Sequence, residues 1–405
     1  MLTVELLLAR ILFVCGFAII GLLAARLLRL DSGLACLGAG VAAGFSLPYL
    51  MFDTGVRAHN LQDLVFYIIL PLLIFEAAWY LKPRLLRQWF LPALILAVPG
   101  AILVTLVSGA LMYVGIGHAS GFPWIAAFLT GAIISATDPT AVVAKLKQLD
   151  APEGLATLME SESLFNDATA VVLFSVVLTM ANGSSAASGS ELAWEFLLAF
   201  VGGGLLGALC GIVTAGLVRM LGNAASSSFI LVFSALASFY LAEHLLQVSG
   251  IMAVTFCAVL ARQLLRHRKQ EMEGTRTTME WLGHALNAVL FTLMGLVITF
   301  DMFSERWLAM LIAIGAGLAA RMAGVACSAG VSQVLGRKIS LGWQLVLWWG
   351  GVRGAVAIAL VLALPEDLPY WWTIQSMVFG VVLFSLLVQG TSVGLLLKRV
   401  PDEQA

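Results

Sequence analysis

The chain has 405 residues, of which 61% are hydrophobic and 11% are charged, and its formal net charge is -1. A mean hydropathy of +0.99 lies far above that of soluble domains, so the composition excludes an ordinary globular protein in water. The nearly neutral charge argues against a strongly acidic or basic partner, and nucleic-acid binding is not expected.

Long apolar stretches follow one another along the whole chain. A bilayer core about 30 Å thick needs about 20 mostly apolar residues per helix, and we count about 13 such stretches. The first has no basic residue before it and no small-residue cleavage site after it, so we expect it to stay as a spanning helix. We therefore predict an all-α polytopic membrane protein with spans near 3–27, 34–52, 63–81, 90–113, 122–144, 155–181, 193–218, 228–246, 249–265, 279–300, 306–333, 341–364 and 371–397.

Lysine and arginine in the connections test this division, because cytoplasmic loops carry an excess of both. One set of alternate connections holds only Arg57 and Arg306. This asymmetry predicts an amino terminus outside the cell and a carboxyl terminus in the cytoplasm. The opposite, basic set consists of Arg26, Arg29, Lys82, Arg84, Arg87, Lys145, Lys147, Arg219, Arg262, Arg266, Arg268, Lys269, Arg276, Arg337, Lys338, Lys398 and Arg399.

The polar connections and the cysteines add no further domain or site. The longest connection runs from about 266 to 278, so we expect a single membrane unit with no soluble regulatory domain. The cysteines lie singly inside apolar segments, without the spacing of metal sites or disulfide frameworks. They are Cys15, Cys36, Cys210, Cys257 and Cys327.

The run from Glu160 to Asp167 places carboxylates inside a stretch otherwise apolar enough to cross a membrane. Ionisable groups at that depth are costly and are functional candidates by default. Residues 155–159 and 168–180 carry no charge, so Asp167 cannot easily be displaced into water. We predict that Asp167 is buried and that its protonation is part of the function.

The polar residues of this span fall on two neighbouring faces, because residues four apart share a helix face. Ser163 and Asp167 form one stripe, and Glu162 and Asn166 form the other. One stripe is then free to face an ion pathway while the other faces a neighbouring helix.

Two other spans contain helix-breaking segments. Pro139, in Thr137-Asp138-Pro139, removes a backbone donor and should break its helix near Asp138. The segment 350–354 places three glycines around Arg353. Irregular backbone at membrane depth is tolerated only where it lines a cavity or is packed in protein. Two interrupted helices in corresponding positions indicate a transporter built from inverted repeats, discontinuous near Asp138 and Gly351.

Further charges lie inside predicted spans. A lone Glu162 would be expensive to keep charged, and the permanently protonated Arg353 is an available partner. Glu76 is another buried carboxylate. Arg321, and Glu243 with its neighbour His244, are more often packing or interface residues, and we leave them out of the site.

These motifs carry a resemblance over nearly the whole chain. The segments Phe75-Glu76-Ala77, Thr137-Asp138-Pro139, Glu162-Ser163-x-x-Asn166-Asp167 and Gly350-Gly351-x-Arg353-Gly354 resemble those of a monovalent cation:proton antiporter, specifically a prokaryotic NhaP-type sodium/proton antiporter. The same group includes the animal sodium/proton exchangers. The combination is specific although each segment alone is weak.

The resemblance implies a role for each matching residue. Asp167 would bind the cation or the proton, with Ser163, the Thr137 carbonyl, Asp138 and Glu76 completing an oxygen-rich sodium site. Asn166 would orient the broken helix, and its place before Asp167 implies electroneutral exchange of one proton for one cation. Glu162 and Arg353 would form a structural ion pair. Glu160 is an extra acid without an assigned place.

The resemblance also implies an architecture and a location. We expect a homodimer in the lipid of the cytoplasmic membrane, with no enzymatic activity and no cofactor apart from the transported sodium or lithium ions and protons. A moving core would include about 63–181 and 279–364, and an interface group would include about 3–52, 193–265 and 371–397.

Competition for one carboxylate would explain the exchange. A hard cation wants several oxygen ligands, while burial favours protonation of the same carboxylate. If only loaded states cross, exchange needs no further coupling device.

Alternative functions stay open. A potassium/proton antiporter would use the same ligands. The sequence alone also distinguishes poorly between a cation channel and an exchanger. An intramembrane hydrolase is disfavoured because neither Gly-x-Gly-Asp nor His-Glu-x-x-His occurs.

Overall fold

The computed structural model describes residues 4–28, 30–50, 64–116, 122–149, 151–181, 189–365 and 367–397. Throughout these ranges the regular structure is helical and no strand occurs, which confirms the predicted all-α class. The described residues include nine helices long and apolar enough to cross a membrane and three shorter apolar helices, Ser32–Ser46, Val65–Tyr80 and Gly250–Leu264. The count of thirteen crossings stays a prediction.

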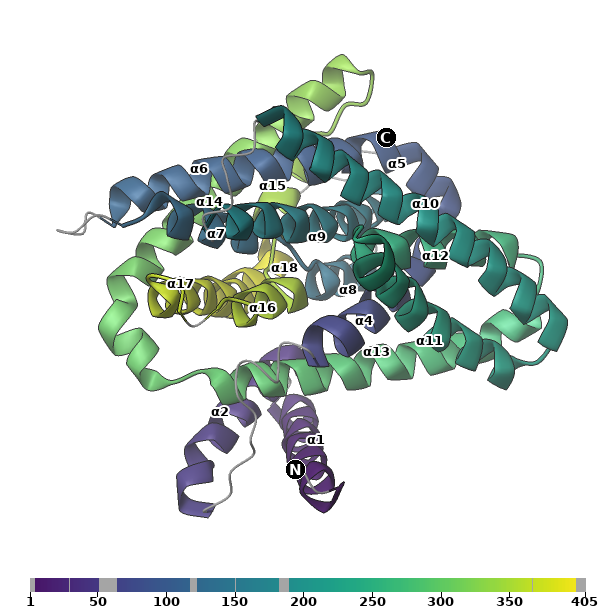
Figure 1. The fold of residues 1–405 in the computed structure, drawn as a ribbon, viewed down its shortest axis with the longest axis horizontal. Coiled ribbons are helices and arrows are strands. Elements are labelled where there is room, and N and C mark those ends of the chain that lie inside the picture. The colour runs from purple at the N-terminus through teal and green to yellow at the C-terminus, as the bar shows by residue number, and fades with distance from the viewer. Residues whose placement is uncertain are drawn as a thin grey trace.

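The helices follow one another with short connections and several π-helical turns (Figure 1). The π-helical turns are Val65–Ile69, Leu96–Gly100, Leu241–Leu246 and Ser385–Gly390. The α-helices are α1 (Val4–Leu28), α2 (Ser32–Leu50), α4 (Leu70–Tyr80), α5 (Pro83–Ile95), α6 (Ala101–Gly115), α7 (Trp124–Ser135), α8 (Thr140–Gln148), α9 (Glu153–Ala181), α10 (Gly189–Leu221), α11 (Ala224–Tyr240), α12 (Gly250–Leu264), α13 (Lys269–Val297), α14 (Phe300–Val334), α15 (Leu341–Trp349), α16 (Ala355–Leu362), α17 (Trp371–Phe384) and α18 (Thr391–Leu397).

Two helices are interrupted where the sequence predicted. The first divides into α7 and α8 around Pro139, and the second into α15 and α16 around the glycines that flank Arg353. The two unwound segments meet, because the Asp138 amide donates to the Val352 carbonyl at 2.6 Å. Each irregular segment therefore gives the other a partner for its backbone, which is the condition for non-helical chain inside a membrane.

Glycines bring two pairs of helices into very close contact. A methyl group at Gly207 of α10 would stand 2.2 Å from the Ala253 carbonyl oxygen of α12, and one at Gly40 of α2 would stand 2.1 Å from the Thr292 carbonyl oxygen of α13. Small residues allow such close backbone approach between helices in a membrane. These contacts fix α10 on α12 and α2 on α13.

The packing divides the helices into two groups that differ from the sequence-based division. α4 and α13 pack against α11 and each other, with α12 beside α4 and α1 and α2 beside α13, whereas α17 packs against α7, α14 and α16. The sequence had assigned α4 and α13 to the moving core and α17 to the interface, and this division into moving and interface helices stays a prediction beside the packing groups. We call α1, α2, α4 and α10–α13 the interface group, and α5–α9 and α14–α18 the core group.

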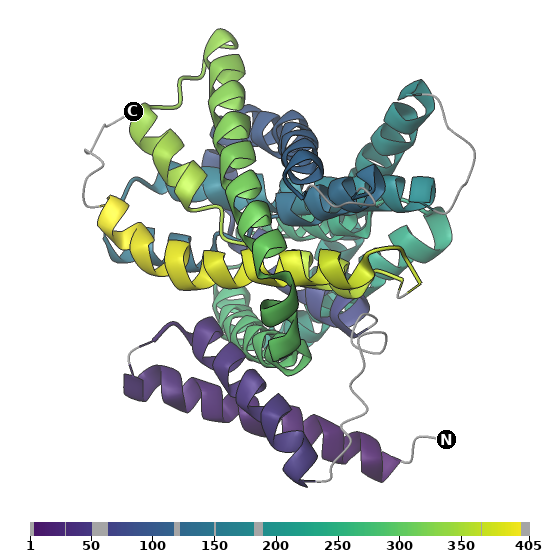
Figure 2. The ribbon, with the colours of Figure 1, turned by 90° about the vertical axis from the view of Figure 1, so that its left-hand side faces the viewer.

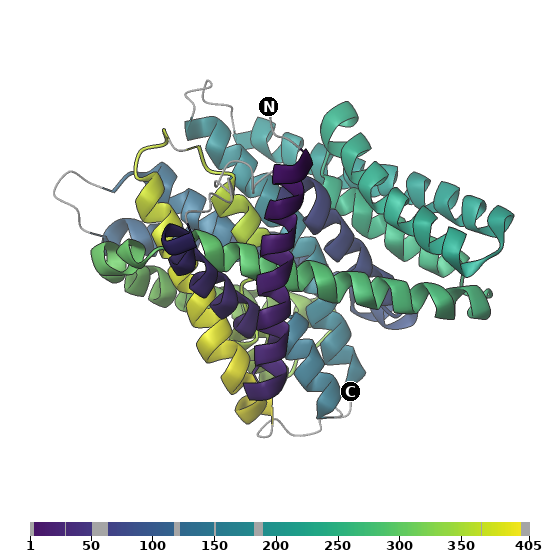
Figure 3. The ribbon, with the colours of Figure 1, turned by 90° about the horizontal axis from the view of Figure 1, so that it is seen from below.

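The views agree on this arrangement. α13 lies between the pair α1 and α2 and the remaining helices (Figures 1 and 2). Seen from below, the teal helices α10 to α12 lie on one side of α1 and the yellow helices at the end of the chain lie on the other (Figure 3). Hydrophobic periodicity alone marks which helices exist, whereas the seams between them depend on which small residues meet.

Candidate functional site

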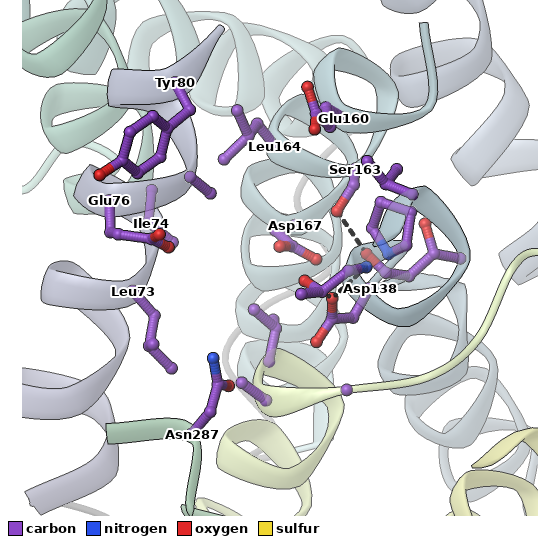
Figure 4. A pocket seen from close by; sticks show the side chains of 18 of the residues that line it. Leu73, Ile74, Glu76, Tyr80, Asp138, Glu160, Ser163, Leu164, Asp167 and Asn287 are labelled. Carbon is purple, nitrogen blue, oxygen red and sulfur yellow. Dashed lines mark hydrogen bonds between the residues drawn. The ribbon is translucent and has the colours of Figure 1, made fainter. Parts of the chain in front are cut away.

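A cavity of about 480 Å³ opens between the two helix groups (Figure 4). On the core side it is lined by α8, α9, the start of α16 and the unwound segment before α8, and on the interface side by α4 and α13. Five residues that the sequence assigned to the site line this one cavity: Glu76, Thr137, Asp138, Ser163 and Asp167. Asn166, the sixth, lies behind it.

One face of α9 turns toward the cavity. Asp167 is 8% exposed, and no hydrogen bond to its carboxylate occurs among the residues that the structure describes. One turn earlier, the Ser163 hydroxyl donates to the Thr137 carbonyl at 2.6 Å, across the gap to the unwound segment. This contact places hydroxyl, carbonyl and carboxylate oxygens beside one another, in the kind of donor set that hard cations prefer.

The neighbouring face of α9 is packed in protein. Glu162 and Asn166 are 2% and 1% exposed. The Asn166 amide donates to the Ser135 carbonyl at 2.7 Å, to the Thr137 hydroxyl at 3.2 Å and to Glu162 at 3.3 Å. Asn166 therefore holds α9 against the end of α7, in line with the orienting role expected of it, and the division into two stripes follows the prediction.

The predicted ion pair between Glu162 and Arg353 is wrong in its partner. Glu162 accepts two hydrogen bonds from Arg321 of α14, at 2.8 and 3.0 Å, in the two-pronged geometry that a guanidinium favours. Arg321 also donates to the Leu347 carbonyl at 3.2 Å, so it joins α9, α14 and α15. The sequence did hold a signal for Arg321, since an arginine inside a long apolar helix is a functional candidate by default.

Arg353 instead serves the broken helix opposite. Its guanidinium donates to the Ser135 and Ala136 carbonyls, each at 3.1 Å, and its backbone amide donates to the Ser385 hydroxyl at 3.0 Å. These carbonyls lie at the carboxyl end of α7, where they have no backbone partner within their own helix and where the helix dipole is negative. Arg353 therefore stabilises the carboxyl end of α7, while Glu162 takes its hydrogen bonds from Arg321.

Asp138 compensates the opposite ends of the half-helices. Its carboxylate accepts from the Thr140 amide at 3.0 Å and from the Thr140 hydroxyl at 2.5 Å, which caps α8. The same carboxylate lies against Gly354 at the start of α16, where a methyl group would stand 2.3 Å from it. The amino ends of helices favour negative charge, so Asp138 and Arg353 neutralise complementary ends of the two broken helices.

The interface side of the cavity contributes residues that the sequence reasoning missed. Arg276, Glu280 and Asn287 of α13 line it, and Glu76 of α4 lies against Gly283 of that helix. Glu76 thus stands on the wall opposite Asp167 (Figure 4). The polar residues of α13 recur on one face of an otherwise ordinary span, but a face pattern does not tell which cavity it borders.

Glu160 also has a place. It pairs with Lys147 of α8 at 3.0 Å and lines the cavity. Glu243, which the sequence left out of the site, accepts from the Gly250 amide at 2.8 Å at the start of α12 and does not line the cavity. The first is a site-border residue and the second is structural.

Together these features define an ion transporter. The two broken helices meet at their unwound segments, which an arginine and an aspartate balance, and part of this irregular backbone borders the cavity. Such segments form the substrate sites of secondary transporters. Asp167 is a buried carboxylate that faces this cavity without a partner among the described residues, and an ionisable group in that position is a functional candidate.

Comparisons with known proteins identify the family. Residues 10–399 match the model of the family described as sodium/hydrogen exchanger, transmembrane. The chain belongs to this family, which is a family of transporters and not of enzymes.

Named relatives and one solved structure agree with this family. The chain is 34% identical over 375 residues to the low-affinity Na(+)/H(+) antiporter NhaS1 of Synechocystis, a match that covers 88% of this chain and 68% of the relative. It is 33% identical over 368 residues to the Na(+)/H(+) antiporter NhaP of Pseudomonas aeruginosa, covering 88% and 86%. The structure of the sodium proton antiporter MjNhaP1 from Methanocaldococcus jannaschii superimposes with a TM-score of 0.82 at 20% identity, over 98% of this chain and 99% of that one, and shows the shared fold.

Proposed function

We propose that this protein exchanges sodium or lithium ions for protons across the cytoplasmic membrane, with Asp167 as the shared binding site. The single observation that carries the proposal is the buried Asp167 carboxylate, which faces the cavity and has no protein partner among the described residues. The names of the relatives, which are Na(+)/H(+) antiporters, support the choice of ions.

The cation would be held by oxygens from both walls of the cavity, chiefly from the face of α9 that borders it. Asp167 supplies the negative charge, and the Ser163 hydroxyl and the Thr137 carbonyl supply neutral oxygens. Glu76 faces them from the interface wall, within reach through water, while Asp138 adds negative potential although its carboxylate is engaged at α8. Metal ligation by Asp167, Ser163, Thr137 and Glu76 stays a prediction of this arrangement.

Exchange follows from competition at Asp167. Sodium needs the ionised carboxylate, while a proton removes its charge, so the two occupants exclude each other. An empty, ionised Asp167 is a lone charge that is costly to carry through a low-dielectric barrier. Glu162 with Arg321, and Arg353 on the α7 carbonyls, keep their compensation in every state and therefore add no transported charge.

One exchanging carboxylate implies one proton for one cation, which makes the reaction electroneutral. The neutral Asn166, bound to backbone and to Glu162, offers no second carboxylate beside Asp167. Purified protein in liposomes should therefore exchange sodium at a rate that does not respond to a potassium diffusion potential set with valinomycin. A rate that follows the imposed voltage would contradict this stoichiometry.

The cavity opens on the side that the basic loops assign to the cytoplasm. Lys147 and Arg276 border it, and both belong to the predicted cytoplasmic set. We infer that the structure represents a cytoplasm-facing state, with the amino terminus outside. A homodimer in the lipid bilayer is part of the same proposal, with contacts expected through the interface group.

Exchange assays with a pH dye inside the liposomes test the proposal. Sodium or lithium added outside should move protons, and each unit by which pH falls should raise the apparent KM for sodium by up to about tenfold at constant maximal rate, because more protons compete for the carboxylate. The same assay with potassium in place of sodium tests the potassium/proton alternative. Proton movement with potassium would support that alternative, and its absence would exclude it. Uptake of sodium without proton movement would point to a channel and overturn exchange.

A further inference from the structure

Four charged side chains at the mouth of the cavity have no role in binding the ion. On the core side, Lys147 of α8 and Glu160 of α9 form an ion pair at 3.0 Å. On the interface side, Arg276 and Glu280 of α13 form an ion pair at 2.7 Å. All four line the cavity, and each pair lies entirely on its own wall.

Both ion pairs lie at the same, open end of the cavity. Glu160 precedes Asp167 by seven residues on one face of α9, a distance of about 10 Å along the helix. Glu160 and Tyr80 stand at one end in Figure 4, and the Tyr80 hydroxyl donates to the Arg276 carbonyl at 3.1 Å. The Lys147 and Arg276 side chains are each 64% exposed, whereas Leu73 toward the other end is 9% exposed.

The two walls belong to different helix groups. α8 and α9 pack in the core group and α13 packs in the interface group. Any movement that narrows the mouth therefore brings the two ion pairs together without changing either pair internally. Because each wall carries one acid and one base, the walls can meet with opposite charges facing.

We propose that these two ion pairs form a gate, in which Lys147 reaches Glu280 and Arg276 reaches Glu160 when the mouth closes over an occupied site. This inference rests on the exchange function proposed above. In the open state every charge keeps a partner on its own wall, so opening leaves none uncompensated. In the closed state the four charges form one network with less water between them, which strengthens their attraction and favours closure.

Charge inversion on one wall tests the gate. The double substitution Lys147→Glu with Glu160→Lys, or Arg276→Glu with Glu280→Arg, keeps each pair within its wall and keeps the net charge of the mouth. Like charges then face each other across the mouth of the cavity. Each double variant should lower the exchange rate at saturating sodium by about tenfold, and all four substitutions together should restore it to within about twofold, since like-charge contacts are removed again.

The matched comparison separates the gate from simpler readings. If the ion pairs were only local surface contacts, each double variant would be as active as the parent. If the four charges only attracted cations to the mouth, the fourfold variant would stay impaired, because each acid and each base would still stand at the other's original position. Either result, in protein that is monodisperse and as thermally stable as the parent, overturns the gate.

A distance measurement tests the gate without relying on transport. Spin labels at Gln148→Cys on α8 and Thr277→Cys on α13, both exposed positions, would span the mouth after the native cysteines are replaced. Labelled protein is diluted with unlabelled protein in lipid nanodiscs, so that distances between copies are not counted. The parent should show two distances, each double variant mainly the longer one, and the fourfold variant both again.

The two failures are distinguishable. A parent that shows both distances but no exchange in liposomes contradicts the proposed function and leaves the gate standing. A parent that exchanges sodium while every variant shows the same single distance contradicts the gate and leaves the function standing.

Discussion

The two faces of α9 place two carboxylates, five residues apart in the chain, in opposite situations. Glu162 is bound by Arg321 through two hydrogen bonds and shares a third with Asn166, and it is 2% exposed. Asp167 is nearly as buried at 8% exposed, yet its carboxylate faces a cavity and has no hydrogen bond to the described part of the protein. Burial alone therefore does not separate a structural acid from a functional one, whereas the supply of partners does.

The difference predicts that each carboxylate fails in its own way when it is neutralised. Loss of the bound acid should affect folding, and loss of the unbound acid should affect transport. The following substitutions test that contrast, in order of decreasing effect.

Asp167→Asn should abolish exchange while leaving the protein folded. Asparagine keeps the shape but neither ionises nor takes up a proton, so competition between the two occupants ends. Proton movement in liposomes and thermal unfolding in detergent measure the two properties. Glu153→Gln is the matched control, because Glu153 pairs with Lys82 at an exposed position. Strong exchange by Asp167→Asn would remove Asp167 from the centre of the mechanism.

Glu162→Gln and Arg321→Gln should each lower the free energy of unfolding by about 3 to 5 kcal/mol, because each leaves an uncompensated charge in the protein interior. Combining Glu162→Gln with Arg321→Gln should cost less than the sum of the single changes. Chemical denaturation in detergent micelles is the measurement, and the exposed Arg306→Ala serves as the control. Additive losses would mean that the two residues act independently.

Gly354→Ala should lower both stability and exchange, since the added methyl group would stand 2.3 Å from the Asp138 carboxylate. Overpacking of this kind costs about 1 to 3 kcal/mol, and here it also displaces the cap of α8. The control is Gly330→Ala, where nothing lies within 4 Å of the added methyl group. If Gly354→Ala and Gly330→Ala have the same stability and exchange rate, the contact between Asp138 and α16 contributes to neither property.

Ser163→Ala should raise the apparent KM for sodium about 2-fold to 10-fold with little change in thermal stability, because one neutral ligand is lost from the open face. Ser161→Ala, on the same helix but with its hydroxyl bonded to the Thr157 carbonyl of its own turn, should leave the KM unchanged. An unchanged KM in Ser163→Ala would place the cation away from Thr137.

Local chemistry explains why much of the site could be predicted. The helical period separates Ser163 and Asp167 from Glu162 and Asn166 within one span, and Pro139 and the glycines around Arg353 interrupt their helices wherever those helices pack. The two interruptions and the oxygen-rich cavity face therefore followed from residues close together in the chain.

The wrong partner for Glu162 was a matter of helices that meet from far apart in the chain. Glu162 and Arg321 are 159 positions apart, and the sequence offered more than one arginine inside its predicted spans as a partner. Similarly, the side on which Glu76 stands depends on α4 packing with α12 and α13 rather than with its neighbours in sequence. Periodicity states that a helix has a polar face without saying which helix that face meets.

The membrane class, the positions of the two helix breaks and the carboxylates that could carry an ion follow from the order of the residues, because apolar length, backbone chemistry and helical period are local properties. The pairing of Arg321 with Glu162, the balance of the broken helix ends by Arg353 and Asp138, and the place of Glu76 opposite Asp167 follow from how the helices pack. These outcomes depend on close packing at glycine seams and on charge compensation between distant helices, which a linear order of residues does not fix.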